Sequence, residues 1–352
     1  MKALVKYAKG PGNLEIREVE EPKVSGDLVK IRVVYAGICG SDLHTWAGEY
    51  ASNKPPVTLG HEFSGIVEEV GSDVKELKVG DRVTSETTFK TCGKCIYCKN
   101  EEYNLCSSRQ GLGTQADGGF AEYVINHEAR IHKLPEKVSL LQASLTEPLA
   151  CCVHGAMETS QVKPGETVLI FGPGAMGLLT GMVCKSQGAK VVIAGLTKDE
   201  KRFEVARTLG FDRIVDQMKE DLGTVMNEMT DGIGPDKIYE CSGAIPALNR
   251  SFELIRKKGE VVQIGVFAKD INEVNVGIFF PKEIHYMGTR TQKPSAWRTS
   301  LQLMEESIVM IDNALFLLHF FVKMIQLLMK VNGFDKKINF NIIKPILFTA
   351  SP

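Results

Sequence analysis

A short apolar run followed by three closely spaced glycines limits the possible folds of this chain more than any other feature. The run, Thr167–Phe171, is continuously apolar after its first residue, as buried parallel strands usually are. Gly172, Gly174 and Gly177 follow it at the start of a helix-length segment. In that context the G-x-G-x-x-G spacing permits a tight turn and lets a pyrophosphate approach the N-terminus of the helix. The pattern therefore predicts a dinucleotide-binding unit, and we include Met176, inside the motif, among its expected cofactor-binding residues.

The segments around this motif alternate between strand and helix patterns. Short apolar strands are expected at residues 190–194, 213–215, 237–240 and 261–264, with helical patterns between them. Such alternation is typical of an α/β fold with a doubly wound parallel sheet. Up to about residue 150, short alternating strands are separated by Gly and Pro turns, which indicates a mostly β domain. With 352 residues the chain is long enough for both.

Four cysteines lie close together in the sequence, in the pattern Cys92-x2-Cys95-x2-Cys98-x7-Cys106. Four thiolates at such short spacing can complete a tetrahedral shell around a zinc ion, and a closed shell leaves no position for a substrate. We therefore predict a structural zinc site. The alternatives are an iron–sulfur cluster, which also uses four thiolates, and four free cysteines in a loop.

A second set of candidate metal ligands is dispersed along the chain. Cys39 ends one predicted strand, and His61 and Glu62 begin the next. Together they offer sulfur, nitrogen and oxygen donors, and a catalytic zinc takes about three protein ligands while a fourth position stays open. The spacing alone also allows a packed cysteine beside unrelated neighbours. Glu147 is a further candidate, or else a solvated charge in the first turn of a helix.

The end of the second strand of the dinucleotide-binding unit bears on the choice between NAD and NADP. NAD-binding units usually place an acidic residue about 20 residues beyond the motif, but here Gly195 follows the strand. The missing carboxylate, with Thr197, Lys198 and Arg202 nearby, favours the 2′-phosphate of NADP. In the alternative, Lys198 and Arg202 are ordinary surface charges and Asp199 binds the ribose of NAD.

The charge balance and the N-terminal sequence limit the partners and the compartment. Lys and Arg number 42 against 43 Asp and Glu, which argues against nucleic acid because phosphate binding needs a basic excess. No charged region followed by an apolar stretch opens the chain, so we expect no secretory signal and a cytoplasmic protein. An apolar stretch at 308–323 is interrupted by Asp312, His319 and Lys323, so we do not expect a membrane span.

Together these patterns resemble the zinc-dependent medium-chain dehydrogenases. Within them the chain is similar to the polyol branch of sorbitol (L-iditol) 2-dehydrogenases, with threonine and butanediol dehydrogenases as near relatives. The resemblance extends from residue 1 to about residue 306 and rests on the cysteine cluster and on residues 37–44, 59–65, 79–83, 119–123 and 147–149.

The resemblance implies a fold and a domain order. A GroES-like catalytic domain would span residues 1–150, with a structural zinc lobe near 86–110. A Rossmann domain would span 151–290, and residues 291–352 would return to the catalytic domain. The active site would lie in the cleft between the two domains.

The resemblance also implies two zinc ions per chain. Cys39, His61 and Glu62 fall on the family's catalytic zinc positions, and Glu147 falls on a glutamate near the zinc and the substrate. The four clustered cysteines fall on the structural zinc lobe.

Further roles follow from the same resemblance. Ser41 and His44 match the family's proton-relay positions. Thr45 and Trp46 would line the substrate pocket, although Trp46 equally suits a packed ring. On the cofactor side, the strand end Ile264, Gly265 and Val266 matches the loop beside the nicotinamide, and Thr289 and Arg290 lie near where relatives return to the cofactor.

The activity implied is the oxidation of a secondary alcohol of a small-molecule polyol to a ketone, with hydride transfer to NADP or NAD, in a homodimer or homotetramer. Oxidation of threonine or 2,3-butanediol is the alternative within the family, and a polyol phosphate is a further candidate substrate. An alternative of another class is an inactive cofactor-binding protein whose C-terminal tail docks to a partner or a membrane.

Residues 307–352 differ in composition from the rest of the chain. They hold one glycine, no glutamate and six of the 16 phenylalanines. This abrupt change suggests the hypothesis that a frameshift replaced the family's usual C-terminus after about Glu306. Missing strands would then expose core surface and sheet edges in the catalytic domain.

Overall fold

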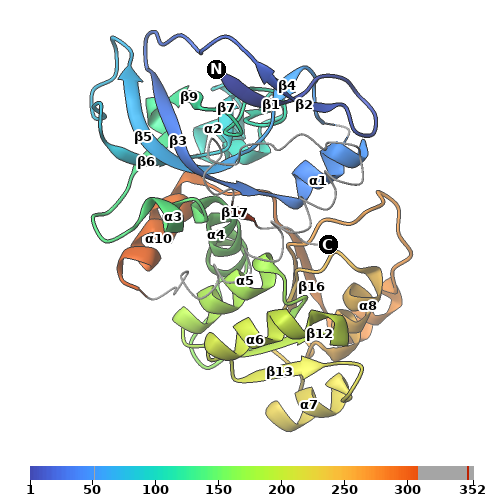
Figure 1. Ribbon diagram of the computed structural model, residues 1–352. Coiled ribbons are helices and arrows are strands. Elements are labelled where there is room, and N and C mark those ends of the chain that lie inside the picture. The colour runs from blue at the N-terminus through green and yellow to red at the C-terminus, as the bar shows by residue number, and fades with distance from the viewer. Residues whose placement is uncertain (51, 308–346, 349–352) are drawn as a thin grey trace. The chain divides into compact units, whose positions relative to one another are not determined.

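The computed structural model describes residues 1–50, 52–307 and 347–348 (Figure 1). The chain divides into two compact units. The first contains Met1–Glu147 and Gln292–Glu305, and the second contains Pro148–Thr291. Most of the tail for which we expect a frameshift falls outside the described residues. Within the described residues we find no helix whose length and apolarity would suit a bilayer crossing.

The first unit consists mainly of short strands joined by turns. Its strands are β1 (Lys2–Lys6), β2 (Leu14–Glu18), β3 (Leu28–Ile38), β4 (Val57–Thr58), β5 (Glu62–Val70), β6 (Arg82–Ser85), β7 (Thr88–Lys90), β8 (Gln110–Gly111), β9 (Tyr123–His127), β10 (Ile131–Lys133) and β17 (Leu347–Phe348). Its helices are α1 (Gly40–Ala47), α2 (Ile96–Lys99), η1 (Tyr103–Leu105), η2 (Glu128–Arg130), α3 (Leu140–Ala143) and α10 (Pro294–Glu305).

The long strand β3 organises this unit. It pairs antiparallel with β5 and β9, and its last two residues pair parallel with β17. The sheet order is β10-β6-β5-β3-β17, and a smaller sheet has the order β2-β1-β4. Alternate residues of a strand face the same side of the sheet. On one side of the sheet, buried side chains form an apolar cluster that includes Val29, Ile31, Phe63, Val67 and Val124.

The second unit alternates strands and helices, as predicted. Its elements after α4 (Thr146–Val153) are the π-helix η3 (His154–Thr159), β11 (Thr167–Phe171), α5 (Ala175–Ser186), β12 (Lys190–Gly195), η4 (Thr197–Asp199), α6 (Glu200–Thr208), β13 (Arg213–Asp216), α7 (Leu222–Met229), β14 (Lys237–Glu240), α8 (Ile245–Leu254), β15 (Glu260–Gln263), η5 (Val276–Ile278), α9 (Phe279–Lys282) and β16 (His285–Gly288). Figure 1 shows α5, α6, α7 and α8 beside the strands of this unit.

The strands of the second unit form one parallel sheet with the order β13-β12-β11-β14-β15-β16. Numbered from β11, this is the order 3-2-1-4-5-6 of a doubly wound dinucleotide-binding sheet. Every residue of β11 is buried, in agreement with its continuous apolar sequence. From β11 the chain adds strands first on one side, through β12 to β13, and then on the other side, through β14 to β16. Ligands of such sheets bind where the direction changes, so we expect the binding site at the carboxyl ends of β11 and β14.

Candidate active site

Cys39, His61 and Glu62 come together because two strands pair antiparallel. β3 ends at Ile38 and β5 begins at Glu62, and the ladder pairs Gly37 with Glu62. The residue after β3 and the first residues of β5 therefore lie side by side. One donor atom from each of the three side chains lies within 4.8 Å of the others. Tetrahedral bonds of about 2.0–2.3 Å separate ligand atoms by about 3.3–3.8 Å, so this donor set fits zinc with a small adjustment.

Asp42, which the sequence analysis missed, supports two of these residues. One oxygen accepts a hydrogen bond from the backbone N–H of Cys39 at 2.9 Å, and the other lies 4.0 Å from Nδ1 of His61. Burial raises the pKa of Asp42. Burial by itself would lower the pKa of His61, but nearby carboxylates, first that of Asp42, raise it. A carboxylate beside a ligand histidine orients the ring, and the available sequence signal was an acidic third residue in α1.

Glu147 is buried, which excludes its interpretation as a solvated helix charge. Only 6% of the residue is exposed, and Nε2 of Gln292 donates to its Oε1 at 3.1 Å. The charge of Glu147 contributes to the raised pKa of both Cys39 and His61, so the carboxylate lies near both. Burial is the main cause that raises the pKa of Cys39 to about 12. Gln292, which lies 145 positions away, had no recognisable sequence signal.

Helix α1 carries the residues predicted for proton transfer. Ser41, His44 and Thr45 have helical i, i+3 and i+4 spacing and therefore share one face. Hydrogen bonds from the hydroxyl and the backbone N–H of Ser41 reach the sulfur of Cys39 and act to lower its pKa. Nδ1 of His44 lies 2.9 Å from Oε2 of Glu49. Of the two predicted relay residues, Ser41 thus lies beside the candidate metal cluster and His44 is partly exposed.

Thr45 and Trp46, predicted to line the substrate pocket, lie at the end of α1. Thr45 is buried and Trp46 is half-buried. The backbone oxygen of Trp46 accepts a hydrogen bond from Gly12 at 2.7 Å. Gly48, with φ of 80°, ends the helix, and a Cβ there would lie 2.6 Å from the backbone nitrogen of Pro11. The N-terminal loop therefore fixes this end of α1, and contact of either side chain with substrate stays a prediction.

The four clustered cysteines converge as their spacing predicts. Their sulfur atoms all lie within 4.8 Å of one another, and those of Cys95 and Cys98 are 3.5 Å apart. All four are free thiols. Hydrogen bonds from the backbone N–H groups of Lys94 and Cys95 lower the pKa of Cys92 to about 6. Since zinc binds the thiolate form, this donor set fits a structural zinc ion.

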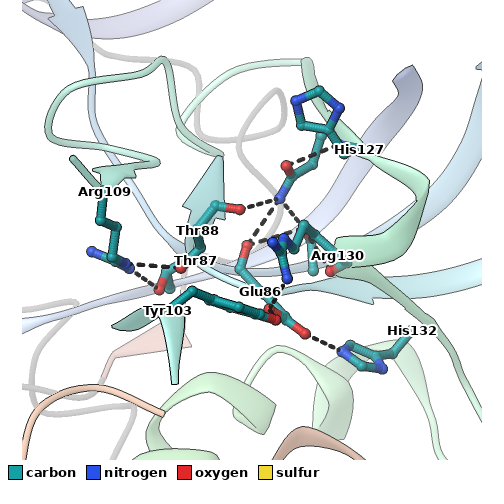
Figure 2. A network of polar contacts seen from close by, with 10 residues as sticks. Glu86, Thr87, Thr88, Tyr103, Arg109, His127, Arg130 and His132 are labelled. Atoms are coloured by element: carbon teal, nitrogen blue, oxygen red, sulfur yellow. Dashed lines mark hydrogen bonds and ion pairs between the residues drawn. The ribbon is translucent and has the colours of Figure 1, made fainter. Parts of the chain in front are cut away.

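A buried carboxylate, Glu86, anchors the cysteine lobe, which we define as residues 88–111. Figure 2 shows Tyr103, Arg130 and His132 turned toward it. The phenol of Tyr103 donates to Glu86, and Nε2 of His132 lies 3.1 Å from its Oε1. The guanidinium of Arg130 lies 3.6 Å from the centre of the Tyr103 ring. His132 thus belongs to a polar network around a buried carboxylate.

The glycine motif forms a tight turn between β11 and α5. Gly172 has φ of 93°, and a Cβ at Gly177 would lie 1.9 Å from the oxygen of Gly172. Gly174 is the N-cap of α5, and Met176 follows in its first turn. That first turn carries no acidic residue. A helix N-terminus of this kind favours an anionic ligand, so the turn fits the pyrophosphate of a dinucleotide.

Gly195 is the last residue of β12, and it pairs with Asp216 on the neighbouring strand. A Cβ at Gly195 would lie 2.8 Å from the ring of Pro173. The hydroxyl of Thr197 donates to Asp216 at 2.8 Å, and Lys198 is exposed. The strand end therefore has no room for the acidic side chain that usually binds the ribose of NAD.

Asp199 is turned toward its own loop. One carboxylate oxygen accepts a hydrogen bond from the backbone N–H of Leu196 at 3.1 Å, and the other accepts from Arg202 at 3.0 Å. The residue is buried. Both of its oxygens thus have local partners, and the guanidinium of Arg202 is partly neutralised by the same contact.

The loop after β15 is held by main-chain hydrogen bonds. The N–H groups of Ile264 and Gly265 both donate to the backbone oxygen of Glu240, at 2.9 and 2.8 Å. Val266 follows and is 78% exposed. An exposed apolar residue at the carboxyl edge of the sheet suits contact with a flat, apolar face of a ligand.

Thr289 and Arg290 follow the last strand of the same sheet. The hydroxyl of Thr289 donates to the backbone oxygen of Gln263 at 3.0 Å, so the start of this segment is tied to the end of β15. Arg290 is exposed. Their contact with a cofactor stays a prediction.

Two family models match the chain. The model described as "Alcohol dehydrogenase GroES-like domain" matches residues 25–136, and that described as "Zinc-binding dehydrogenase" matches residues 175–306. The chain is 47% identical over 312 residues to D-arabitol-phosphate dehydrogenase of Enterococcus avium, which covers 89% of each chain. It is also 47% identical over 309 residues to sorbitol dehydrogenase of Halalkalibacterium halodurans, which covers 88% of this chain and 90% of the relative.

Solved structures agree with these matches. A zinc-binding dehydrogenase from Sinorhizobium meliloti bound to NADP superimposes with a TM-score of 0.81 at 32% identity, over 88% of this chain and 90% of that one. The 2R,3R-butanediol dehydrogenase from Bacillus subtilis superimposes with a TM-score of 0.79 at 33% identity, over 89% and 90%. These findings confirm the predicted α/β fold with a GroES-like and a Rossmann part.

Proposed function

The chain belongs to the zinc-binding medium-chain alcohol dehydrogenases, and from that premise we propose that it oxidises a secondary alcohol of a small polyol to a ketone with hydride transfer to NADP or NAD. The observation that carries this proposal is the convergence of Cys39, His61 and Glu62 within 4.8 Å. Among the described residues this S, N and O donor set has three members, which leaves a position for a substrate oxygen, unlike the closed set of four cysteines.

We propose that the dispersed cluster holds the catalytic zinc and the cysteine lobe holds a second, structural one. A zinc ion at the dispersed cluster would act as a Lewis acid that makes the substrate hydroxyl more acidic. Cys39, His61 and Glu62 would hold it, and Asp42 would keep the imidazole oriented. Glu147 would lie beside it and position a substrate hydroxyl, since Gln292 fixes one of its oxygens.

Ser41 and His44 would move the proton. Ser41 already directs its hydroxyl at the sulfur of Cys39, so it lies where a substrate hydroxyl at this cluster would release its proton. His44, on the same face of α1, would receive the proton, and its Nδ1 lies 2.9 Å from Oε2 of Glu49. Thr45 and Trp46 would exclude water beside the substrate. The dinucleotide supplies the acceptor for the hydride.

We propose that residues 151–290 bind the dinucleotide and that residues 1–150, with the segment from 291 onward, bind the substrate. The glycine turn at Gly172, Gly174 and Gly177, with Met176, would hold the pyrophosphate. Ile264, Gly265, Val266, Thr289 and Arg290 would contact the nicotinamide half.

We propose that NADP is preferred over NAD. The argument rests on Gly195, which leaves no carboxylate at the strand end, and on the local partners of both Asp199 oxygens. Thr197, Lys198 and Arg202 would surround the 2′-phosphate. The dissociation constants of NADPH and NADH, measured by nucleotide fluorescence, test the preference, and tighter binding of NADH would reject it.

A polyol or polyol phosphate is the proposed substrate class. The two relatives at 47% identity are named for D-arabitol phosphate and for sorbitol. The threonine dehydrogenase of Pyrococcus horikoshii is 34% identical and the butanediol dehydrogenase structure 33%. Oxidation of threonine or butanediol is therefore the weaker candidate.

We propose that the protein forms a homodimer or homotetramer in the cytoplasm. In the part of the chain that the structure describes, β16 is one of the two edge strands of the second unit's sheet, and Phe280, on the helix α9 that precedes it, is 92% exposed. Ile271, in the same unit, is 90% exposed. A strand edge and exposed apolar side chains suit pairing with a second copy. A reducing compartment suits the four clustered cysteines, whose thiols converge without a disulfide. Light scattering of the protein and of Phe280→Asp tests the assembly, since a monomeric parent protein would reject it.

The primary experiment measures zinc per chain and then activity. The purified protein would be analysed for metal and assayed with D-arabitol, D-arabitol phosphate, sorbitol, threonine and 2,3-butanediol, each with NADP and NAD. Two zinc ions and turnover of a polyol or its phosphate would support the proposal. Two zinc ions with turnover of threonine or butanediol alone would correct the substrate class. Cofactor binding without zinc at the dispersed cluster and without turnover would favour the inactive, cofactor-binding alternative.

A further inference from the structure

The second unit contains a fully buried carboxylate that the proposed chemistry does not use. Glu240 is the last residue of β14 and has no exposed surface. Glutamate is almost never fully buried unless it is paired. Among the described residues, its partners are hydrogen-bond donors from the turn after β14 and from Gln263 at the end of β15 rather than a cation.

The side chain of Glu240 accepts four hydrogen bonds. Oε1 accepts from the backbone N–H of Ser242 at 2.8 Å and also from its hydroxyl. Oε2 accepts from the backbone N–H of Gly243 at 3.0 Å and from Nε2 of Gln263 at 2.6 Å. Each oxygen thus has two donors, so the buried carboxylate finds its hydrogen-bond partners within the protein.

These donors connect three parts of the proposed cofactor site. Ser242 packs on the glycine turn, because a Cβ at Gly172 would lie 2.9 Å from the Cβ of Ser242. Gly243 packs on the loop after β15, because a Cβ at Gly265 would lie 2.5 Å from the nitrogen of Gly243. The turn after β14 therefore lies between the pyrophosphate turn and the nicotinamide-side loop, and Glu240 holds it there.

Gln263 extends this arrangement to the last strand. Its Nε2 donates both to Glu240 and to the backbone oxygen of Gly265, at 2.7 Å. Its Oε1 accepts from the phenol of Tyr286 at 3.2 Å, and its backbone oxygen accepts from the hydroxyl of Thr289 at 3.0 Å. The amide of Gln263 thus contacts the loop after β15 and the last strand, and its backbone oxygen holds the start of the segment that we propose to contact the nicotinamide.

We propose that Glu240 is a positioning residue for the dinucleotide, which acts through Ser242, Gly243 and Gln263 to set the spacing between the glycine turn and the nicotinamide-side loop. This inference rests on the proposed dinucleotide binding of the same unit. Glutamine has the same shape, but its amide would turn an N–H donor toward groups that are themselves donors. Glu240→Gln therefore leaves at least one buried donor without an acceptor and lets the loops move apart.

Glu260 provides a matched control at the amino ends of the strands, opposite the carboxyl ends where Glu240 lies. It is the first residue of β15, and its carboxylate lies 2.6 Å from Nζ of Lys237, the first residue of β14. Glu260→Gln removes the same charge from a neighbouring strand but leaves both loops untouched. It should lower the thermal midpoint without a change in cofactor affinity.

The test compares the two variants as zinc-loaded, full-length protein. For Glu240→Gln we expect the dissociation constant of NADPH, measured by fluorescence titration, to rise about 10–100-fold, as one or two unsatisfied buried donors would produce. Zinc content and the KM for the polyol should stay within about twofold, because the change acts on cofactor binding alone. Glu260→Gln should bind NADPH like the parent protein.

Three results would overturn the proposal. An unchanged NADPH dissociation constant in Glu240→Gln shows that the carboxylate does not position the loops. An equal loss of affinity in both variants shows a general effect of stability. If Glu240→Gln does not fold, Gln263→Ala replaces it, with an expected rise of about threefold to tenfold because it removes one hydrogen bond to each partner; no rise again overturns the proposal. If the parent protein binds neither NADPH nor NADH, the proposed function itself fails.

Discussion

The two candidate metal centres lie in one unit of the protein, yet they are built in opposite ways. The cysteine lobe takes its four ligands from a stretch of 15 residues, from Cys92 to Cys106. The dispersed cluster takes Cys39 from the end of β3 and His61 and Glu62 from the start of β5. The first needs only a local loop, whereas the second exists only when a long antiparallel ladder has the correct register. A site that depends on strand register has its ligands held in fixed positions, as catalysis requires. A metal site built from one short loop can stabilise that loop on its own.

The largest expected effect separates the two centres by function. His61→Ala should remove one zinc ion per chain and reduce kcat by about 10³-fold or more, because Lewis-acid activation of the alcohol is lost. The lobe zinc should remain, since no lobe ligand changes. Metal analysis and steady-state kinetics measure both quantities.

His127→Ala is the control for this substitution. His127 is a half-exposed histidine of the same unit that pairs with Asp27 and lies in neither cluster. The His127→Ala variant should retain two zinc ions and full activity. Loss of both zinc ions in His61→Ala would contradict the independence of the two centres.

The same contrast decides what the sequence could predict. The convergence of the four lobe cysteines and the tight glycine turn follow from the local sequence because their geometry is local. The convergence of Cys39 with His61 depended on a pairing between strands that spacing alone left open. The sequence analysis missed Asp42, Gln292 and Glu240. The role of each depends on a hydrogen-bond partner that tertiary packing brings close, and Gln292 lies 145 positions from its partner Glu147.

A second prediction compares the thiols of the two centres in zinc-free protein. Backbone N–H groups lower the pKa of Cys92 to about 6, whereas burial raises that of Cys39 to about 12. At pH 7 Cys92 is mostly thiolate and Cys39 is almost entirely thiol. Iodoacetamide should therefore alkylate Cys92 about 10²-fold faster, because the larger thiolate fraction outweighs the lower nucleophilicity.

The pH dependence of alkylation gives the sign of each shift. The rate at Cys92 should level off above about pH 7, while the rate at Cys39 should keep rising about tenfold per pH unit to pH 10. Mass spectrometry of peptides at timed intervals measures both. In denaturant the two rates should converge, and similar rates in the folded protein would contradict the prediction.

A third prediction tests the support of the dispersed cluster. Asp42→Asn keeps the shape of the side chain but removes the charge beside His61, so zinc affinity at this cluster should fall by about 10–100-fold. Competition with a chelator measures the affinity of each centre. Asp27→Asn, which alters the exposed pair of Asp27 with His127, serves as the control and should change the zinc affinity of neither centre. Equal weakening of the lobe zinc would show that Asp42 supports the whole unit rather than one cluster.

The smallest expected effect concerns the anchor of the lobe. Tyr103→Phe removes the phenol that donates to the buried Glu86 but keeps the ring under Arg130. Loss of this buried hydrogen bond should lower the free energy of unfolding by about 1–2 kcal/mol, while zinc content and activity at 25 °C stay unchanged. Burial raises the pKa of Tyr103 above its ordinary value. The contribution of the phenol is therefore fully present below its unfolded pKa of about 10 and is lost only as pH rises further. Urea unfolding of both proteins should show a constant difference from pH 7 to 9. A loss of activity would mean that the local centre and the register-dependent one are coupled after all.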